Sequence, residues 1–199
     1  MMMKKGFFIT LYGINNLGKS LQAYKLVKWF KEKNHKAEYL KYPVYNLAPS
    51  GYIINEQLRG EKGQTISEEK LQFWFAVNRM HYEPILISKL NSGITIVAED
   101  YTGTGLAWGE AKNADKFYLR QINKVLLKED LSILFRGERF KSGIEKRHVH
   151  ERNFKLVEIC KDVHDNLAIE FGWKPLDANQ SRDRVFNDLV AIVKRELKI

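Results

Sequence analysis

Eight consecutive residues near the start of the chain have the types and spacing that bind a nucleoside triphosphate. Residues 13–20, GINNLGKS, fit the pattern G-x-x-x-x-G-K-[ST]. The glycines let backbone N–H groups surround phosphate oxygens, Lys19 can reach the β- and γ-phosphates, and the Ser20 hydroxyl can ligate Mg²⁺. The residues expected to hold ATP and Mg²⁺ are Gly13, Asn15, Asn16, Leu17, Gly18, Lys19 and Ser20. The loop leaves the phosphate acceptor undetermined.

A second pair of residues could bind that acceptor. Phe75 and Arg79 are four apart in the helix-like segment 71–81, so they would lie on one helix face. A flat ring and a guanidinium placed together could stack on a base and donate paired hydrogen bonds to a phosphate. The pattern also fits a core phenylalanine beside a solvated arginine, and from these residues alone both interpretations stand.

The elements that must position these residues alternate between strands and helices. The apolar run at residues 6–12, which leads into the loop, is typical of a buried parallel strand, and a helix with apolar residues at helical spacing follows at 19–33. Further strands are expected at residues 37–42, 94–98, 131–135 and 173–178. Further helices are expected from Ser67 through Met80, with Pro84 either kinking this helix or opening the next, and at 115–128, 154–171 and 184–197.

This alternation predicts an α/β protein with the P-loop NTPase fold. We expect about five parallel strands with helices on both faces, because parallel strands need crossover helices that cover the sheet. No internal repeat or interdomain linker interrupts the pattern, so residues 1–199 are expected to form a single domain that contains the 13–20 loop.

The composition is that of an ordinary globular protein, with 44% hydrophobic and 29% charged residues. The net charge of +9 predicts attraction to polyanions, although most of the basic residues are typical of a solvated surface. The lone cysteine, Cys160, excludes an intramolecular disulfide and a cysteine-based metal site, and its apolar register predicts core packing. The N-terminal residues lack an apolar stretch of signal-peptide or membrane-spanning length, so a cytoplasmic location is expected.

Five segments together resemble the thymidylate kinase family over nearly the whole chain. In the family's order they are GINNLGKS at 13–20, FAVNRMH at 75–81, GITIVAEDY at 93–101, TGLAW at 104–108 and LDA at 176–178. The resemblance implies a kinase that transfers the γ-phosphate of ATP directly to dTMP. It also implies nucleotide partners rather than nucleic acid or membrane, and a homodimer, for which Phe73, Trp74 and Val77 offer an apolar surface.

The resemblance also implies which residues contact the acceptor. Phe75 would stack on the thymine and Arg79 would hold the acceptor phosphate. Tyr42 and Pro43 match a segment that contacts the phosphate and closes over the base. The positions that match the deoxyribose pocket are Tyr101, Thr104, Gly105 and Trp108. A bulky aromatic at the last of these would crowd a ribose 2′-hydroxyl and so favour deoxynucleotides.

Three positions next to the expected site differ from the family. Glu99 takes the place of the family's leading aspartate and would organise Mg²⁺ and the reacting phosphates from one methylene further away. Asn15 replaces an aspartate of the loop and cannot supply a full negative charge. Asp100 replaces an arginine, which removes a phosphate-binding cation and adds repulsion. Either other cations compensate, or the activity is weak.

A basic segment at residues 136–152 is the expected source of compensating charge. It follows a predicted strand and suits a lid that closes over ATP and stabilises the transferring phosphoryl group, although a solvated basic loop or helix fits the same residues. The loop at 13–20 contains no arginine, so the resemblance implies a catalytic arginine from the lid, with Arg147 first and Arg139 and Arg152 as alternatives. His148 and His150 are two apart, which predicts surface histidines rather than a zinc site.

Three other functions remain compatible with the sequence. The first is a kinase for a different deoxynucleotide or for a deoxynucleoside, which would share the loop and differ in the acceptor pocket. The second is a non-catalytic ATP-binding homologue, suggested by Asn15 and Asp100. The third is a nucleic-acid-binding module, suggested only by the charge, which would bind DNA or RNA with a steep salt dependence.

Overall fold

The computed structural model describes residues 5–140 and 154–199, which form five strands and seven helices within that part of the chain. The strands are β1 (Phe8–Tyr12), β2 (Ala37–Lys41), β3 (Thr95–Glu99), β4 (Leu131–Arg136) and β5 (Lys174–Asp177). The helices are α1 (Lys19–Glu32), α2 (Ser50–Arg59), α3 (Glu68–Asn91), α4 (Thr102–Ala111), α5 (Lys116–Asn123), α7 (Phe154–Phe171) and α8 (Arg182–Leu197). The five strands and the helix at 154–171 confirm the sequence-based predictions.

The strands form one parallel sheet in the order β2-β3-β1-β4-β5. After β1 the chain adds β2 and β3 on one side of this strand and then β4 and β5 on the other, so the strand order switches at β1. In sheets of this kind a ligand binds at the carboxyl ends of the strands near the switch point. The residues that follow β1 and β3 are the 13–20 loop and the Asp100-Tyr101 pair, and the sheet brings them to the same edge.

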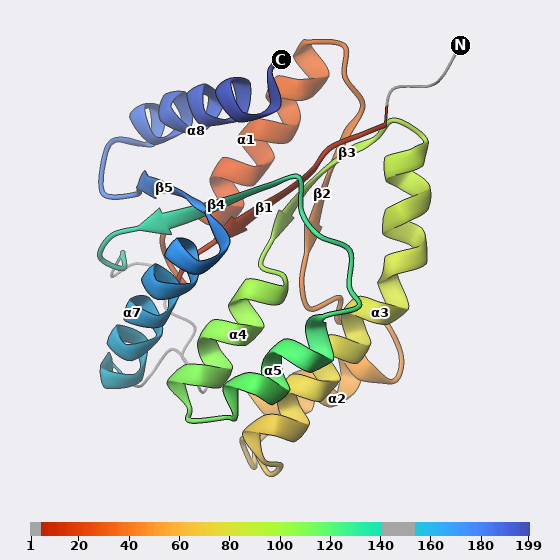
Figure 1. Ribbon diagram of the computed structural model, residues 1–199, viewed down its shortest axis with the longest axis vertical. Coiled ribbons are helices and arrows are strands. Elements are labelled where there is room, and N and C mark those ends of the chain that lie inside the picture. The colour runs from red at the N-terminus through yellow and green to blue at the C-terminus, as the bar shows by residue number, and fades with distance from the viewer. Residues whose placement is uncertain (1–4, 141–153) are drawn as a thin grey trace.

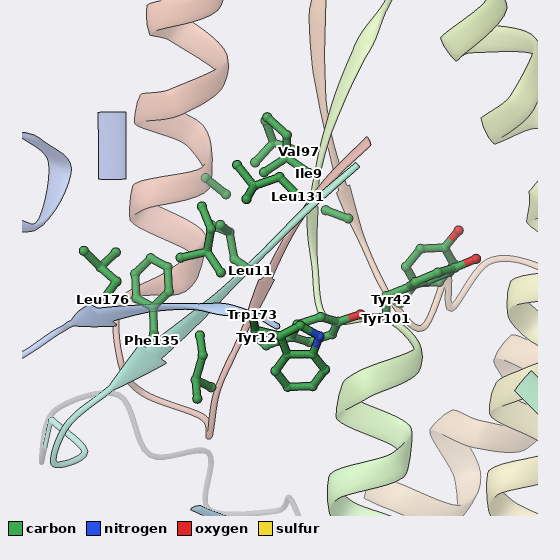
Figure 2. Packing of buried hydrophobic residues seen from close by; sticks show 14 of the residues in the cluster. Ile9, Leu11, Tyr12, Tyr42, Val97, Tyr101, Leu131, Phe135, Trp173 and Leu176 are labelled. Atoms are coloured by element: carbon green, nitrogen blue, oxygen red, sulfur yellow. The ribbon is translucent and has the colours of Figure 1, made fainter. Parts of the chain in front are cut away.

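Helices cover both faces of the sheet, as the sequence predicts. Helices α1 and α8 pack on one face, and α3, α4 and α7 lie on the other (Figure 1). Every residue of β1 and β3 is buried, because side chains alternate between two covered faces. Figure 2 shows Ile9 and Leu11 of β1 on the α1 side together with Val97 and Leu131. Tyr12 points the other way and stacks on Trp173 with ring centroids 4.2 Å apart.

Of the two sequence-based predictions at Pro84, the start of a new helix there is wrong, and a kink in the existing helix stays a prediction. Residues 68–91 form one continuous helix that contains Pro84, and the Ser67 side chain caps it by accepting a hydrogen bond from Lys70 N at 3.3 Å. A proline costs a helix one backbone hydrogen bond and some crowding. Leu86 and Leu90, beyond the proline, are fully buried in the core, and this packing holds the last two turns in helical register.

Two helices were missed and one was predicted too long. Residues 50–59 lie in a polar stretch of the sequence, for which no helix was predicted. Helix α2 forms there because Ile54 and Leu58 pack on Leu71 of α3. Residues 102–111 contain three glycines, which lower helix propensity by about 1 kcal/mol each. Tertiary packing overrides that cost, because a Cβ at Gly105 would lie 2.8 Å from the Arg79 guanidinium. Helix α5 ends at Asn123 rather than at residue 128.

Two features are absent from the described residues. None of the helices there is both long and apolar enough to span a lipid bilayer. No three His, Cys, Asp or Glu side chains gather there as a metal site. Cys160 is buried in the core, as predicted, and the predicted surface histidines His148 and His150 lie outside the described part of the chain.

Candidate active site

A pocket of about 270 Å³ opens at the carboxyl edge of the sheet. Its walls come from the 13–20 loop, the end of β2 and the segment after it, helices α2, α3 and α4, and the end of β3. The sequence-predicted residues that line it are Asn15, Asn16, Gly18, Lys19, Ser20, Tyr42, Pro43, Phe75, Arg79, Glu99, Tyr101, Thr104, Gly105 and Trp108. Residues predicted for two different ligands therefore share one pocket.

The loop between β1 and α1 has the backbone shape that surrounds an anion. Gly13 and Gly18 both have positive φ, at 126° and 78°. A Cβ at Gly13 would lie 2.5 Å from the carbonyl oxygen of Phe135, so only glycine fits there. The N-cap residue of α1 is Gly18, which has no side chain to cap the first turn, so a ligand such as phosphate can approach the N–H groups there. Leu17 is buried beneath the loop and does not line the pocket.

Lys19 lies inside the loop with only 3% of its side chain exposed. Its ammonium donates hydrogen bonds to the carbonyl oxygens of Gly13 at 2.7 Å and Ile14 at 2.8 Å. The carboxylate of Asp100 is 3.7 Å away. The carbonyl groups of the loop thus hold the Lys19 ammonium at the centre of the loop. Phosphate oxygens that bind in the loop would meet this positive charge there.

Glu99 ends β3 and is a buried carboxylate with four stabilising neighbours. Tyr39 donates to it at 2.7 Å and Lys41 at 3.0 Å, and Ser20 donates a further hydrogen bond. Burial alone would raise the pKa of Glu99, but Lys19, Lys41 and these hydrogen bonds together lower it below its ordinary value. Glu99 is therefore ionised at neutral pH and lies against the Ser20 hydroxyl.

The negative charge of the Asp100 carboxylate lies close to the positive charges of Lys19 and Lys41. It has a positive φ of 62°, and its carboxylate accepts a hydrogen bond from the Thr104 hydroxyl at 3.0 Å. Burial raises the pKa of Asp100 and the neighbouring Glu99 adds to this, while Lys19 and Lys41 oppose it. Lys19 contacts this carboxylate, and Lys41 is a second nearby cation. That other cations compensate for the arginine of the family stays a prediction.

Phe75 and Arg79 form the end of the pocket furthest along α3. The Arg79 guanidinium carbon lies 6.0 Å from the ring centroids of both Phe75 and Tyr101, and its Nη1 donates to Asn123 Oδ1 at 2.9 Å. Only 4% of Arg79 is exposed, so the interpretation of a solvated arginine is wrong. The two side chains therefore lie close together in one part of the pocket.

Asn78 fixes the segment that carries Tyr42 and Pro43. It is fully buried on α3, accepts a hydrogen bond from Val44 N at 2.8 Å and donates to Val44 O at 3.0 Å. Its amide also donates to the Ser50 hydroxyl at 3.0 Å. One side chain thus joins α3, the post-β2 segment and the start of α2, which are three walls of the pocket.

We expect Asn78→Ala to lower the free energy of unfolding by about 2–4 kcal/mol, because the N–H and C=O groups of Val44 would both lose a partner. Urea unfolding measures the change. Asn91→Ala is the control, since Asn91 is exposed at the end of the same helix and should alter stability by less than about 0.5 kcal/mol. Equal stabilities for Asn78→Ala and the wild type would contradict the bridging role.

The start of the basic segment lies against the phosphate-binding loop. Phe140 N donates to Asn16 O at 2.9 Å, and the Phe140 ring would lie 3.6 Å from a Cβ at Gly18. Arg139 precedes Phe140 in the sequence and is therefore close to the loop, although it does not line the pocket. Arg147 and Arg152, the other two arginines predicted from the sequence, lie outside the described residues.

Six residues that line the pocket were not among the predicted site residues. One is Asp100, which the sequence identified only as a difference from the family. The others are Lys41, Tyr45, Leu58, Arg59 and Gln72. Lys41 could have been found, because it ends a predicted strand at the edge where ligands bind. Leu58 and Arg59 depend on α2, whose apolar Ile54–Leu58 pair was a weak i, i+4 signal within a polar stretch.

Comparisons with known proteins agree with this geometry. A family model described as thymidylate kinase matches residues 11–189. A probable thymidylate kinase of Pyrococcus horikoshii is 30% identical over 97% of this chain and 98% of its own length. The human thymidylate kinase is 28% identical over 94% and 89%, and that of Dictyostelium discoideum is 27% identical over 99% and 89%. The solved structure of Candida albicans thymidylate kinase superimposes with a TM-score of 0.81 at 22% identity, covering 96% of this chain and 92% of that one.

Proposed function

The chain belongs to the thymidylate kinase family, and on that premise we propose that it transfers the γ-phosphate of ATP to dTMP, giving dTDP and ADP. The family resemblance predicted from the sequence is thereby confirmed. One observation carries the proposal for the site: a single pocket is lined both by Lys19 and Ser20 of the phosphate-binding loop and by Phe75 and Arg79 of α3. A donor and an acceptor bound there would face each other.

The donor end of the pocket suits ATP with Mg²⁺. Lys19 would move from the loop carbonyls onto the β- and γ-phosphates, and the loop amides would hold the remaining oxygens. Ser20 and the ionised Glu99 are adjacent oxygen donors of the kind that Mg²⁺ prefers, so they fit the ion. When bound, Mg²⁺ neutralises charge on the phosphate oxygens. Lys41 keeps Glu99 ionised and oriented.

The acceptor end suits a deoxynucleoside monophosphate. Phe75 would stack on the base, and Arg79 would donate to acceptor oxygens from its place between Phe75 and Tyr101. Tyr42 and Pro43, held by Asn78, would close the side of the site. The residues proposed to enclose the deoxyribose are Tyr101, Thr104, Gly105 and Trp108.

The reaction needs no covalent intermediate with the protein. Attack of an acceptor phosphate oxygen on the γ-phosphorus would release ADP in one in-line step, and negative charge would spread over the transferring oxygens. Arg139, beside the loop, is proposed to stabilise that charge. Arg147 and Arg152 stay sequence-based predictions for the same role.

A coupled assay of ADP release tests the proposed function. Purified protein with ATP and Mg²⁺ is given dTMP, dUMP, dCMP, dGMP, AMP or thymidine in turn, and dTMP is expected to give the highest kcat/KM. Stimulation by thymidine alone would indicate a deoxynucleoside kinase. If no acceptor stimulates ADP release, the kinase proposal is wrong and ATP binding without turnover remains.

Replacement of Trp108 should relax discrimination against ribonucleotides. Trp108→Ala removes the bulky side chain next to the proposed sugar site, so the ratio of kcat/KM for dTMP to that for its ribose counterpart should fall roughly tenfold. The same assay measures both acceptors. Phe117→Ala is the control, because Phe117 is an exposed aromatic on α5 away from the pocket. An unchanged ratio in Trp108→Ala would exclude this residue from sugar selection.

We also propose that the protein is a homodimer that uses α3. Phe73 is 45% exposed on this helix, and Ile85 and Ile87 are exposed apolar residues further along it. Trp74, which the sequence suggested for the same surface, packs partly against the α2 cluster instead. Light scattering after size-exclusion chromatography is expected to give twice the chain's 23.3 kDa.

A further inference from the structure

A tyrosine and an arginine that sequence reasoning missed meet in the wall of the pocket. Tyr45 belongs to the segment after β2, and Arg59 is the last residue of α2. Arg59 Nη1 donates to the Tyr45 hydroxyl at 2.6 Å, and the guanidinium carbon lies 4.8 Å from the Tyr45 ring centroid. Two contacts to one side chain fix where this positive charge lies.

Packing and hydrogen bonds hold the last turn of α2, and with it the backbone of Arg59, in place. Leu58, its neighbour, is buried against Ile54 and Leu71. Gln57 accepts hydrogen bonds from Thr65 N at 2.8 Å and from Ile66 N at 3.2 Å, which ties the last turn to the following loop. A long arginine side chain loses less freedom on binding a ligand when its helix and its partner are already fixed.

The Tyr45–Arg59 pair lies near the charged centre of the pocket. Tyr45 and Arg59 line the same pocket as Lys41, and Lys41 contacts Glu99 at 3.0 Å. The cationic residues that line the pocket are Lys19, Lys41, Arg59 and Arg79, and the carboxylates are Glu99 and Asp100. Each carboxylate contacts one of the lysines, and the four cations and two carboxylates give the lining a formal net charge of +2.

We propose that Arg59, positioned by Tyr45, binds the monophosphate of the acceptor nucleotide together with Arg79. This inference rests on the proposed function and adds to it a residue that determines acceptance of a phosphorylated nucleoside. Asp100 stands after β3 where the family has an arginine, and Arg59 supplies a guanidinium to the same pocket from the end of α2. A planar guanidinium can donate two parallel hydrogen bonds to a phosphate, which a lysine cannot.

Calorimetric binding of dTMP and of thymidine, without ATP, tests the assignment. Arg59→Ala should weaken dTMP binding about tenfold to thirtyfold and leave thymidine binding within about twofold, since only dTMP has the phosphate. Arg59→Lys should recover part of the loss. Tyr45→Phe, which keeps the ring and removes the hydroxyl, should weaken dTMP binding about threefold. Arg195→Ala is the control, because it removes an exposed positive charge at the far end of α8.

Each alternative result is distinguishable. Equal losses for dTMP and thymidine would assign Arg59 to the base or to packing and overturn the inference. Wild-type affinity for dTMP in Arg59→Ala would overturn it while leaving the proposed kinase function intact. If the wild type itself binds neither ligand, both the proposed acceptor and this inference fail. Thermal melting of each variant shows whether the fold is retained.

Discussion

Lys19→Ala is expected to lower kcat by about a thousandfold or more. The Lys19 ammonium is the charge at the centre of the phosphate-binding loop, and in the proposed reaction it meets the β- and γ-phosphates as negative charge moves between them. Its removal also leaves Asp100 without its contact at 3.7 Å. Affinity for ATP with Mg²⁺ should fall at least about tenfold. Steady-state kinetics and titration with a fluorescent ATP analogue measure the two effects.

Two further variants make this result interpretable. Lys28→Ala removes an exposed lysine of the same helix that pairs with Glu32, and its activity should match the wild type within about twofold. Lys19→Met keeps most of the side-chain volume, so its melting temperature separates lost charge from lost packing. Undiminished ATP affinity in both Lys19 variants would show that the loop does not bind a triphosphate.

Glu99→Gln is expected to lower kcat by about a hundredfold and to raise the Mg²⁺ concentration needed for half-maximal activity. The substitution keeps the shape of the side chain and removes its negative charge. Tyr39 and Lys41 donate to different carboxylate oxygens, so one of them would lose its acceptor to the amide nitrogen. The side chain next to Ser20 would also lack the negative charge that attracts a divalent cation. Activity is measured across a Mg²⁺ titration at saturating ATP and dTMP.

The control for Glu99→Gln is Glu38→Gln on the neighbouring strand. Glu38 pairs with Lys89 away from the pocket, so its loss should leave the Mg²⁺ dependence unchanged. If Glu99→Gln has wild-type kcat and the wild-type Mg²⁺ dependence, Glu99 holds Lys41 in place and does not contribute to the metal site.

Most of the fold could be predicted from the sequence, because its strongest signals are local. The buried strands are short β-branched and apolar runs such as TIVAE at β3, and α7 spans the predicted residues 154–171. The errors occur where distant packing decides. Helix α4 contains three glycines, because closely packed neighbours such as Arg79 leave no room for larger side chains. The same packing holds the segment in a helix despite the low helix propensity of glycine. Pro84 is tolerated because the residues beyond it are buried.

The candidate site could be predicted in outline, because its main motifs follow strands whose carboxyl ends share one edge. Every residue predicted for the acceptor lines the pocket, as do five of the seven loop residues. The partners of Asp100 could not be predicted, since Lys19 and Lys41 reach it from other strands and loops. Arg59 was missed for the same reason, because its place depends on the packing of α2 against α3.

Transfer of labelled phosphate tests the central claim most directly. The protein is incubated with [γ-³²P]ATP, Mg²⁺ and dTMP, and the products are separated by chromatography. Binding of both nucleotides in one pocket predicts that the label passes to dTDP in amounts equal to the ADP formed. Label found only in inorganic phosphate, or retained in ATP, would contradict it.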